Sequence, residues 1–176
     1  AGHGMETQMS HENVLRLSDF QSFTNENLPL WVTASCDIMP FDGTKATIGE
    51  AAVLNKKGGA VAFYGTTRTV FASQNTPLNV SFMKHVLTVE DGKPIGIGEA
   101  QRRTKNEMII AGYDRTQNKL QYSLLGDPAM PLNLPTMSVV IDSINGVAMA
   151  DGNTPQLKAG AVVELKGHIE DNQGVM

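Results

Sequence analysis

Residues 28–39, LPLWVTASCDIM, decide the fold of this 176-residue chain, because they join a strand pattern to its single cysteine. The run from Leu28 to Ser35 is almost continuously apolar. Such a run predicts a strand that is covered on both faces, as in the parallel sheets of α/β domains. Cys36 ends the run, and the carboxyl ends of strands are where sites form in open α/β sheets.

Helix and strand patterns alternate on both sides of this strand. Residues 18–23 predict a short helix ahead of it. Residues 44–59, TKATIGEAAVLNKKGG, predict a helix that Thr44 or Thr47 caps, and Thr47 with Glu50 matches a capping box. Residues 59–64 then predict a second buried strand.

The alternation continues as far as residue 135. Pro77 is expected at the first position of a helix, whose apolar face recurs at every fourth residue, namely Leu78, Phe82 and Val86. Residues 98–105 predict another helix, and residues 120–125 predict another strand. Because strands and helices alternate, we predict an α/β domain over residues 1–135, with a mostly parallel sheet flanked by helices.

The pattern changes after Pro135. Val139 and Ile141 alternate with polar neighbours, and residues 161–170 repeat this period of two. Such alternation is typical of antiparallel strands with two different faces. Residues 136–176 number 41, and a seven-stranded sandwich needs about 100. We therefore expect this segment to be the truncated beginning of a β-sandwich domain.

Composition excludes several classes of protein. The net charge of −4 and the absence of a basic stripe argue against a nucleic-acid partner. One cysteine forbids an internal disulfide, and no apolar run approaches the roughly 18 residues of a membrane span. The chain begins AGHG without a methionine or a signal peptide, so we interpret it as a piece of a longer protein.

Cys36 admits two interpretations. A thiol at a strand end becomes a nucleophile when an imidazole or a helix N-terminus stabilises its thiolate. His3 is a candidate partner, because Gly2 and Gly4 flank it and allow close backbone approach. The alternatives are a small buried thiol and an ordinary loop histidine. A metal site formed by His3, His11 and Cys36 has no recognised spacing, so we predict none.

Several separated segments resemble the gingipain-like cysteine peptidases. Residues 2–7, GHGMET, resemble their glycine–histidine–glycine motif, and residues 33–42, TASCDIMPFD, resemble their nucleophile segment. Residues 124–132, LLGDPAMPL, are similar to the end of their catalytic domain, ahead of an immunoglobulin-like module. Within the family, four segments look like the sortase branch that serves type IX secretion, namely residues 28–43, 56–72, 79–84 and 118–128. The likeness covers roughly residues 1–135.

The resemblance implies both a fold and a chemistry. The fold would be the C-terminal half of a caspase-like, gingipain-type sheet, followed by the start of an immunoglobulin-like domain. Cys36 would be the nucleophile and His3 its acid–base partner, and the N–H groups of Gly4 and Cys36 would form the oxyanion hole. Tyr64, Arg68 and Phe71 follow the second strand and are candidates to line the substrate pocket. The alternative for those three is a packed strand end with an exposed arginine.

The resemblance also implies substrates and a location. The enzyme would remove a C-terminal secretion-signal domain from protein cargo at the outer-membrane surface, together with other type IX secretion components. It would pass the acyl group to an amine of anionic lipopolysaccharide or to water. Gingipain-type relatives bind calcium, but no calcium loop is recognisable here. We therefore predict no cofactor and keep calcium as an alternative that only the resemblance implies.

Two departures qualify the resemblance. The family places the acid that orients the histidine upstream of the GHG motif, and this chain begins after that point. The upstream strands are absent as well, so we expect this chain to be inactive by itself. The rival hypothesis is a catalytically silent cell-surface interaction module on the same fold.

Overall fold

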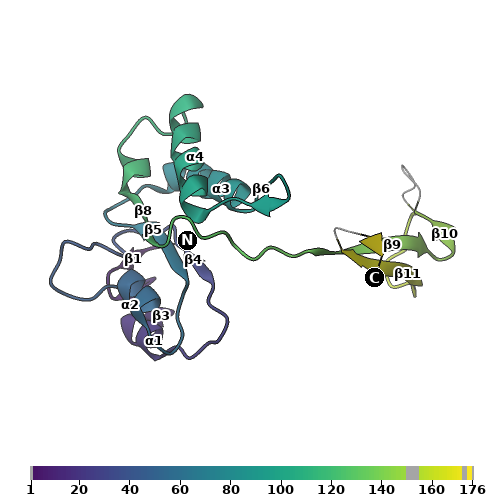
Figure 1. Cartoon of the computed structure of the whole chain (residues 1–176), viewed down its shortest axis with the longest axis horizontal. Helices are drawn as coiled ribbons and strands as arrows, with labels where there is room; N and C mark the ends of the chain where they lie inside the picture. The colour runs from purple at the N-terminus through teal and green to yellow at the C-terminus, as the bar shows by residue number, and fades with distance from the viewer. Residues whose placement is uncertain (1, 150–154, 172–173, 176) are drawn as a thin grey trace. The chain divides into compact units, whose positions relative to one another are not determined.

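The computed structural model describes residues 2–149, 155–171 and 174–175. The chain divides into two compact units, residues 1–132 and residues 133–176. The first unit is an α/β structure and the second is an antiparallel β-sheet (Figure 1). Among the described helices, none is both long enough and apolar enough to span a membrane.

A three-stranded sheet in the order β4-β5-β8 forms the centre of the first unit. Its strands are β4 (Leu30–Val32), β5 (Ala62–Thr66) and β8 (Tyr122–Gly126). β4 pairs with β5 in parallel, as the sequence predicted, whereas β8 pairs with β5 antiparallel. The prediction of a mostly parallel sheet is therefore wrong for the last strand in the sheet.

The reversal of β8 follows from the connection before it. Two helices, α3 (Ala72–Val86) and α4 (Ile97–Ile110), separate β5 from the short 3-10 helix η1 (Asn118–Gln121). The chain therefore returns to the carboxyl end of β5 before β8 begins. There the N–H of Thr67 donates to the carbonyl of Gln121 at 2.8 Å.

Helices cover both faces of this sheet (Figure 1). One core joins β5 to α3 and α4, and it contains Tyr64, Leu78, Phe82, Val86 and Tyr122. The other joins β5 to α1 (Leu17–Ser22) and α2 (Ile48–Leu54). Successive β5 side chains alternate between the two cores, because neighbouring residues of a strand point to opposite faces. The predicted apolar face at residues 78, 82 and 86 is thus confirmed.

The two large helix predictions had different outcomes at their first residues. Thr47 caps α2, its hydroxyl accepting from the N–H of Glu50 at 3.3 Å while the Glu50 carboxylate accepts from the N–H of Thr47 at 2.8 Å. The predicted capping box is confirmed. The predicted start of the next helix at Pro77 is wrong, because α3 begins at Ala72 and Pro77 lies inside it. Phe71, the residue before α3, has no side-chain cap from the local sequence, and its own N–H donates to Oδ1 of the distant Asn118 at 2.7 Å.

Short strands complete the first unit. β1 (Gly4–Met5), β2 (Gln8–Met9) and β3 (Leu15–Arg16) form a small antiparallel sheet. β6 (Val89–Glu90) and β7 (Lys93–Pro94) form a hairpin between α3 and α4, where the sequence predicted only a loop.

The second unit is a sheet in the order β10-β9-β11-β12, with every described pair antiparallel. Its strands are β9 (Met137–Ile144), β10 (Val147–Ala148), β11 (Leu165–Asp171) and β12 (Gly174–Val175). Asn145 and Gly146 both have positive φ, at 50° and 77°, and form the tight turn between β9 and β10. The predicted antiparallel pattern is confirmed, although residues 161–164 lie outside the strand.

Candidate active site

Cys36 lies beyond the carboxyl end of β4, where the chain turns sharply. The N–H of Thr33 still donates to the carbonyl of Tyr64 at 3.0 Å, so the segment follows β5 after β4 ends. The hydroxyl of Thr66 donates to the carbonyl of Ser35. Asp37 then adopts a φ of 48°, in the left-handed region that few non-glycine residues enter. Both ends of the Cys36 backbone are thereby fixed.

The GHG segment runs beside this turn. The N–H of Gly2 donates to the carbonyl of Ala34 at 3.3 Å. At Gly4, an added Cβ would lie 2.5 Å from Cδ1 of Ile38, 2.9 Å from Cβ of Ser35 and 3.3 Å from the carbonyl oxygen of Cys36. Only glycine allows that approach. His3 therefore lies between two points at which its segment contacts residues 34–38.

His3 and Cys36 line the same pocket. The pocket has a volume of about 500 Å³ and opens between the nucleophile turn and the first turns of α3. The described residues that line it are Gly2, His3, Ala34, Ser35, Cys36, Val70, Ala72, Asn75, Thr76, Asn79 and Val80. Apart from His3 and Cys36, the described lining residues have no ionisable side chain. The arrangement brings a thiol and an imidazole to the wall of one mostly apolar cavity.

The Cys36 sulfur has two backbone contacts. The thiol donates to the carbonyl of Val70 at 3.4 Å, and the N–H of Val70 donates to the sulfur at 3.5 Å. A backbone N–H directed at sulfur favours the thiolate, whereas a carbonyl favours the neutral thiol. Val70 lies in the segment that follows β5, and Cys36 lies in the segment that follows β4. The parallel pairing of β4 with β5 therefore brings Val70 next to the sulfur.

The predictions for Gly4 and Cys36 as oxyanion donors are compatible with their placement. Gly4 lies next to Cys36, since an added Cβ at Gly4 would be 3.3 Å from the Cys36 carbonyl oxygen, although of these two residues the described pocket lining includes Cys36 alone. An oxyanion hole needs two N–H groups that converge on one point about 3 Å away. Their role stays a prediction.

Tyr64 does not line the pocket, and that prediction is wrong. Its side chain is fully buried and stacks on Phe82 with ring centroids 3.9 Å apart. Burial raises the pKa of its phenol far above the ordinary value, so this side chain belongs to the core between β5 and α3.

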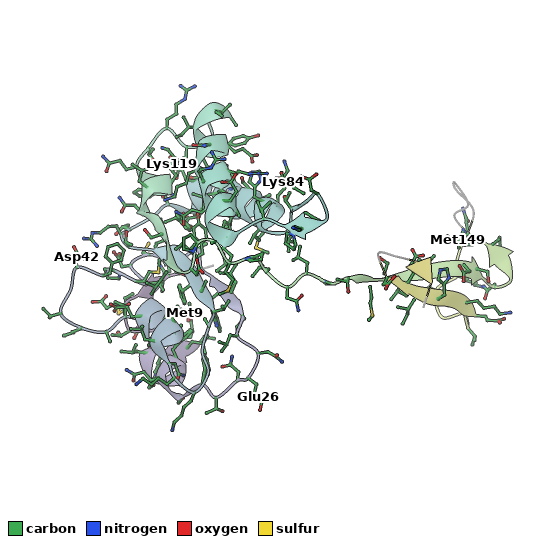
Figure 2. All side chains as sticks on the ribbon, in the orientation of Figure 1. Met9, Glu26, Asp42, Lys84, Lys119 and Met149 are labelled. Atoms are coloured by element: carbon green, nitrogen blue, oxygen red, sulfur yellow. The ribbon has the colours of Figure 1, made fainter. Side chains whose placement is uncertain are left out.

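Arg68 and Phe71 are exposed, and neither belongs to the described lining of the pocket. Arg68 forms an ion pair with Asp42, which lies on the loop between β4 and α2 (Figure 2). A hydrogen bond from Arg68 lowers the pKa of the Asp42 carboxyl. The alternative interpretation, a packed strand end with an exposed arginine, matches this geometry.

The pocket wall formed by α3 was not predicted from the sequence. Asn75, Thr76, Asn79 and Val80 come from the early turns of α3, and the sequence had placed the helix start at residue 76. Asn75 and Asn79 are four residues apart and so share one helix face, which is the signal that could have revealed this wall. If the helix had been predicted to begin at residue 72, Asn75 and Asn79 would have been recognised as polar residues on one face of it.

No metal site accompanies the pocket. Within residues 2–149, 155–171 and 174–175, no group of three histidine, cysteine or acidic residues is placed to hold a metal ion.

Known proteins resemble this chain in sequence and in fold. The model of the family described as peptidase family C25 matches residues 1–133. No curated protein matches the chain. The crystal structure of the Arg-specific cysteine proteinase gingipain R (RgpB) is 17% identical with a TM-score of 0.66, over 80% of this chain and 35% of that chain.

Two further structures are similar. The complex of the pro- and mature domains of RgpB from Porphyromonas gingivalis is 19% identical with a TM-score of 0.64, over 80% of this chain and 36% of that chain. The structure of dimeric latent PorU from the same organism is 30% identical with a TM-score of 0.37, over 68% of this chain and 11% of that chain. The chain thus spans about a third of the length of the RgpB structures that it matches.

Proposed function

The chain belongs to peptidase family C25, the gingipain family that its sequence predicted, and from that premise we propose that His3 and Cys36 form a catalytic pair. The observation that carries this proposal is their joint position on one pocket of about 500 Å³. The fit of Gly4 against residues 35–38 supports it, because the contact holds the His3 segment next to the nucleophile turn.

The proposed reaction is acyl transfer. The Cys36 thiolate attacks a peptide carbonyl, and the N–H groups of Gly4 and Cys36 stabilise the tetrahedral oxyanion by about 3 kcal/mol each. The carbon–nitrogen bond breaks while the His3 imidazolium gives a proton to the leaving amine. An incoming amine or water then gives a proton to His3 and attacks the thioester, which releases the Cys36 thiolate.

The pocket lining supports one statement about substrates. The side chains contributed by α3 are apolar or carry neutral amide and hydroxyl groups. An uncharged substrate side chain next to the cleaved bond suits such a wall, because a buried charge needs a partner of opposite sign.

We further propose the sortase type of reaction for the whole protein. The support is the ordered likeness of the segments at residues 28–43, 56–72 and 118–128 to the sortase branch. The substrates would be cargo proteins with a C-terminal secretion signal, and the acceptor would be an amine of lipopolysaccharide or water. The location would be the outer-membrane surface, together with other type IX secretion components.

Two finer features of the fold belong to the same proposal. The β4-β5-β8 sheet would be part of a caspase-like sheet, and residues 133–176 would begin an immunoglobulin-like domain. Exposed apolar residues on one face of the second unit, such as Val139, Ile141 and Ile169, support the second point. In a sandwich, that face would be covered by a second sheet.

A chemical test separates the enzyme from a silent interaction module. If the pair is catalytic, iodoacetamide should label Cys36 faster than it labels a model thiol at pH 6. The substitution His3→Ala should slow the labelling of Cys36. His11→Ala is the matched control, because His11 is a nearby exposed histidine outside the pocket lining. Equal labelling rates in all three proteins would favour the silent module.

A cellular test addresses the sortase reaction. Mass spectrometry of secreted cargo from cells with Cys36→Ala should detect C-terminal signal domains that are still attached. Normal cargo processing in those cells would remove the sortase proposal, and it would leave the labelling result to decide the peptidase question.

A further inference from the structure

The resting thiol of Cys36 is hydrogen-bonded to a carbonyl that another residue orients. The acceptor is the carbonyl of Val70, 3.4 Å from the sulfur. The significance of this contact rests on the proposed function, in which Cys36 must ionise to attack. A fixed acceptor for the thiol proton stabilises the neutral form, so whatever fixes that carbonyl affects when the thiol ionises.

Asn118 fixes this carbonyl through the peptide bond between Val70 and Phe71. In a trans peptide the C=O and the N–H point in opposite directions. The C=O end points to Cys36, and the N–H end, which belongs to Phe71, donates to Oδ1 of Asn118 at 2.7 Å. One peptide group therefore connects the Asn118 side chain to the thiol.

Asn118 is itself held rigidly. It is 4% exposed, its amide nitrogen donates to Oδ1 of Asn75 at 3.1 Å, and its backbone N–H donates to the hydroxyl of Thr116 at 3.1 Å. Asn75 is a pocket-wall residue, so the same amide ties α3 to the start of β8. Lys119, the next residue along η1, is likewise held, donating to the carbonyls of Asp114 and Thr116 (Figure 2).

We propose that Asn118 is a positioning residue for the peptidase site, which orients the Val70 carbonyl and thereby fixes the acceptor for the proton of the Cys36 thiol. Asn118 is 82 positions away in sequence from Cys36, and it is not among the described residues that line the pocket. The expected direction is that, without Asn118, the thiol ionises more readily.

The direction follows from which peptide loses its support. Loss of Asn118 frees the 70–71 peptide, so its carbonyl can turn away from the sulfur. The N–H of Val70 belongs to the preceding peptide, and a separate contact holds that segment, since the Thr69 hydroxyl donates to Oδ2 of Asp37 at 3.2 Å. The thiol therefore loses its acceptor, while the thiolate keeps its donor.

The other ionisable groups around the sulfur do not change with the substitution. His3 shares the pocket, and Asp37 follows Cys36 in the chain. Arg68 is in an exposed ion pair, and Tyr122 is a buried phenol at the start of β8. Their charges are the same in the wild type and in a neutral Asn118 variant. A difference between the two proteins therefore does not come from a changed charge around the sulfur.

The test is the pH profile of Cys36 alkylation by iodoacetamide, measured by mass spectrometry on the folded protein. In Asn118→Ala the profile should move to lower pH, with a rate about 2- to 5-fold faster than wild type on its rising limb, the effect of one weak hydrogen bond. Asn118→Asp keeps an oxygen for the Phe71 N–H and adds negative charge. Its profile should therefore stay in place or move to higher pH. Asn118→Leu replaces the alanine variant if that protein does not fold.

Asn55→Ala is the matched control. Its side-chain amide also bridges separate segments, donating to the carbonyls of Phe20 and Phe23 at 3.0 and 2.8 Å, on the opposite face of the sheet. The proposal is overturned if the alanine variant at residue 118 keeps the wild-type profile, moves to higher pH, or moves no further than Asn55→Ala. Alkylation needs no peptide substrate, so this outcome is independent of whether the protein cleaves its proposed cargo.

Discussion

Replacing Gly4 with alanine should separate the histidine segment from the nucleophile turn. The added Cβ would lie 2.5 Å from Cδ1 of Ile38 and 2.9 Å from Cβ of Ser35. Ordinary carbon contacts are about 3.5–4.0 Å, so the overlap is about 1 Å. Ile38 is fully buried and Ser35 is 6% exposed, so neither can move into solvent. The backbone of residues 2–5 must move instead.

That displacement has an energetic and a catalytic consequence. Overpacking at a tightly packed site lowers the free energy of unfolding by about 1–3 kcal/mol. A displacement of about 1 Å in a catalytic group reduces the rate by about 100-fold. Gly4→Ala should therefore lower stability and should slow both peptide cleavage and any assistance that His3 gives to Cys36 alkylation.

Two assays measure these effects. Urea unfolding can be followed by the fluorescence of Trp31, the single tryptophan. Its ring packs edge-on against the ring of Phe20, with the two ring centroids 5.1 Å apart. Alkylation of Cys36 at pH 6 reports the thiol–imidazole contact. Gly43→Ala is the control, because an added Cβ at Gly43 meets no atom within 4 Å.

One result would refute this reasoning. If Gly4→Ala and Gly43→Ala have equal unfolding free energies and equal alkylation rates, the GHG segment is not packed against the nucleophile turn. The proposed catalytic pair would then lose its geometric basis.

The remaining predictions concern stability and titration. Thr47→Ala should lower the free energy of unfolding by about 1 kcal/mol in urea melts, because the cap of α2 is lost, whereas Thr44→Ala, at an exposed loop residue, should leave it unchanged. Burial raises the pKa of Tyr122 from 10.0 to about 12, so between those pH values the folded protein retains a proton that the unfolded chain loses. The free energy of unfolding should therefore fall as pH rises from 10 to 12. Alkaline unfolding followed by circular dichroism should show a less steep fall in Tyr122→Phe. A hydrogen bond with Asp142 raises the pKa of His168 above 6.5 in the folded protein. This pairing therefore stabilises the fold fully below pH 6.5, and the stabilisation is lost as pH rises through the pKa of His168 in the folded protein. NMR titration should show a lower His168 pKa in Asp142→Asn, and an unchanged value would contradict the pairing.

The antiparallel direction of β8 shows a limit of sequence reasoning. A strand was predicted at residues 120–125 and β8 lies at residues 122–126, because the apolar pattern of a strand is local. The direction of pairing depends on how many times the chain crosses the domain before the strand begins. That number is set by α3 packing on α4, which no local period records.

The candidate site was predictable in part for a related reason. His3, Gly4 and Cys36 could be named from the sequence, because glycines beside a histidine and a thiol at a strand end are local patterns. Tyr64 was assigned wrongly to the pocket. Its position along β5 was right, but the face to which it points depends on the packing of Phe82 from α3.

By itself, the sequence determined the order of the longer helices and central strands of the first unit, the capping box of α2 and the apolar face of α3, because each depends on residues close to one another in the chain. Only the tertiary structure decided where α3 begins, which residues wall the pocket and what holds the thiol. Those features depend on pairs such as Phe71 with Asn118 and Cys36 with Val70, which are 47 and 34 residues apart. Such partners meet only after the sheet and its two helical layers have packed.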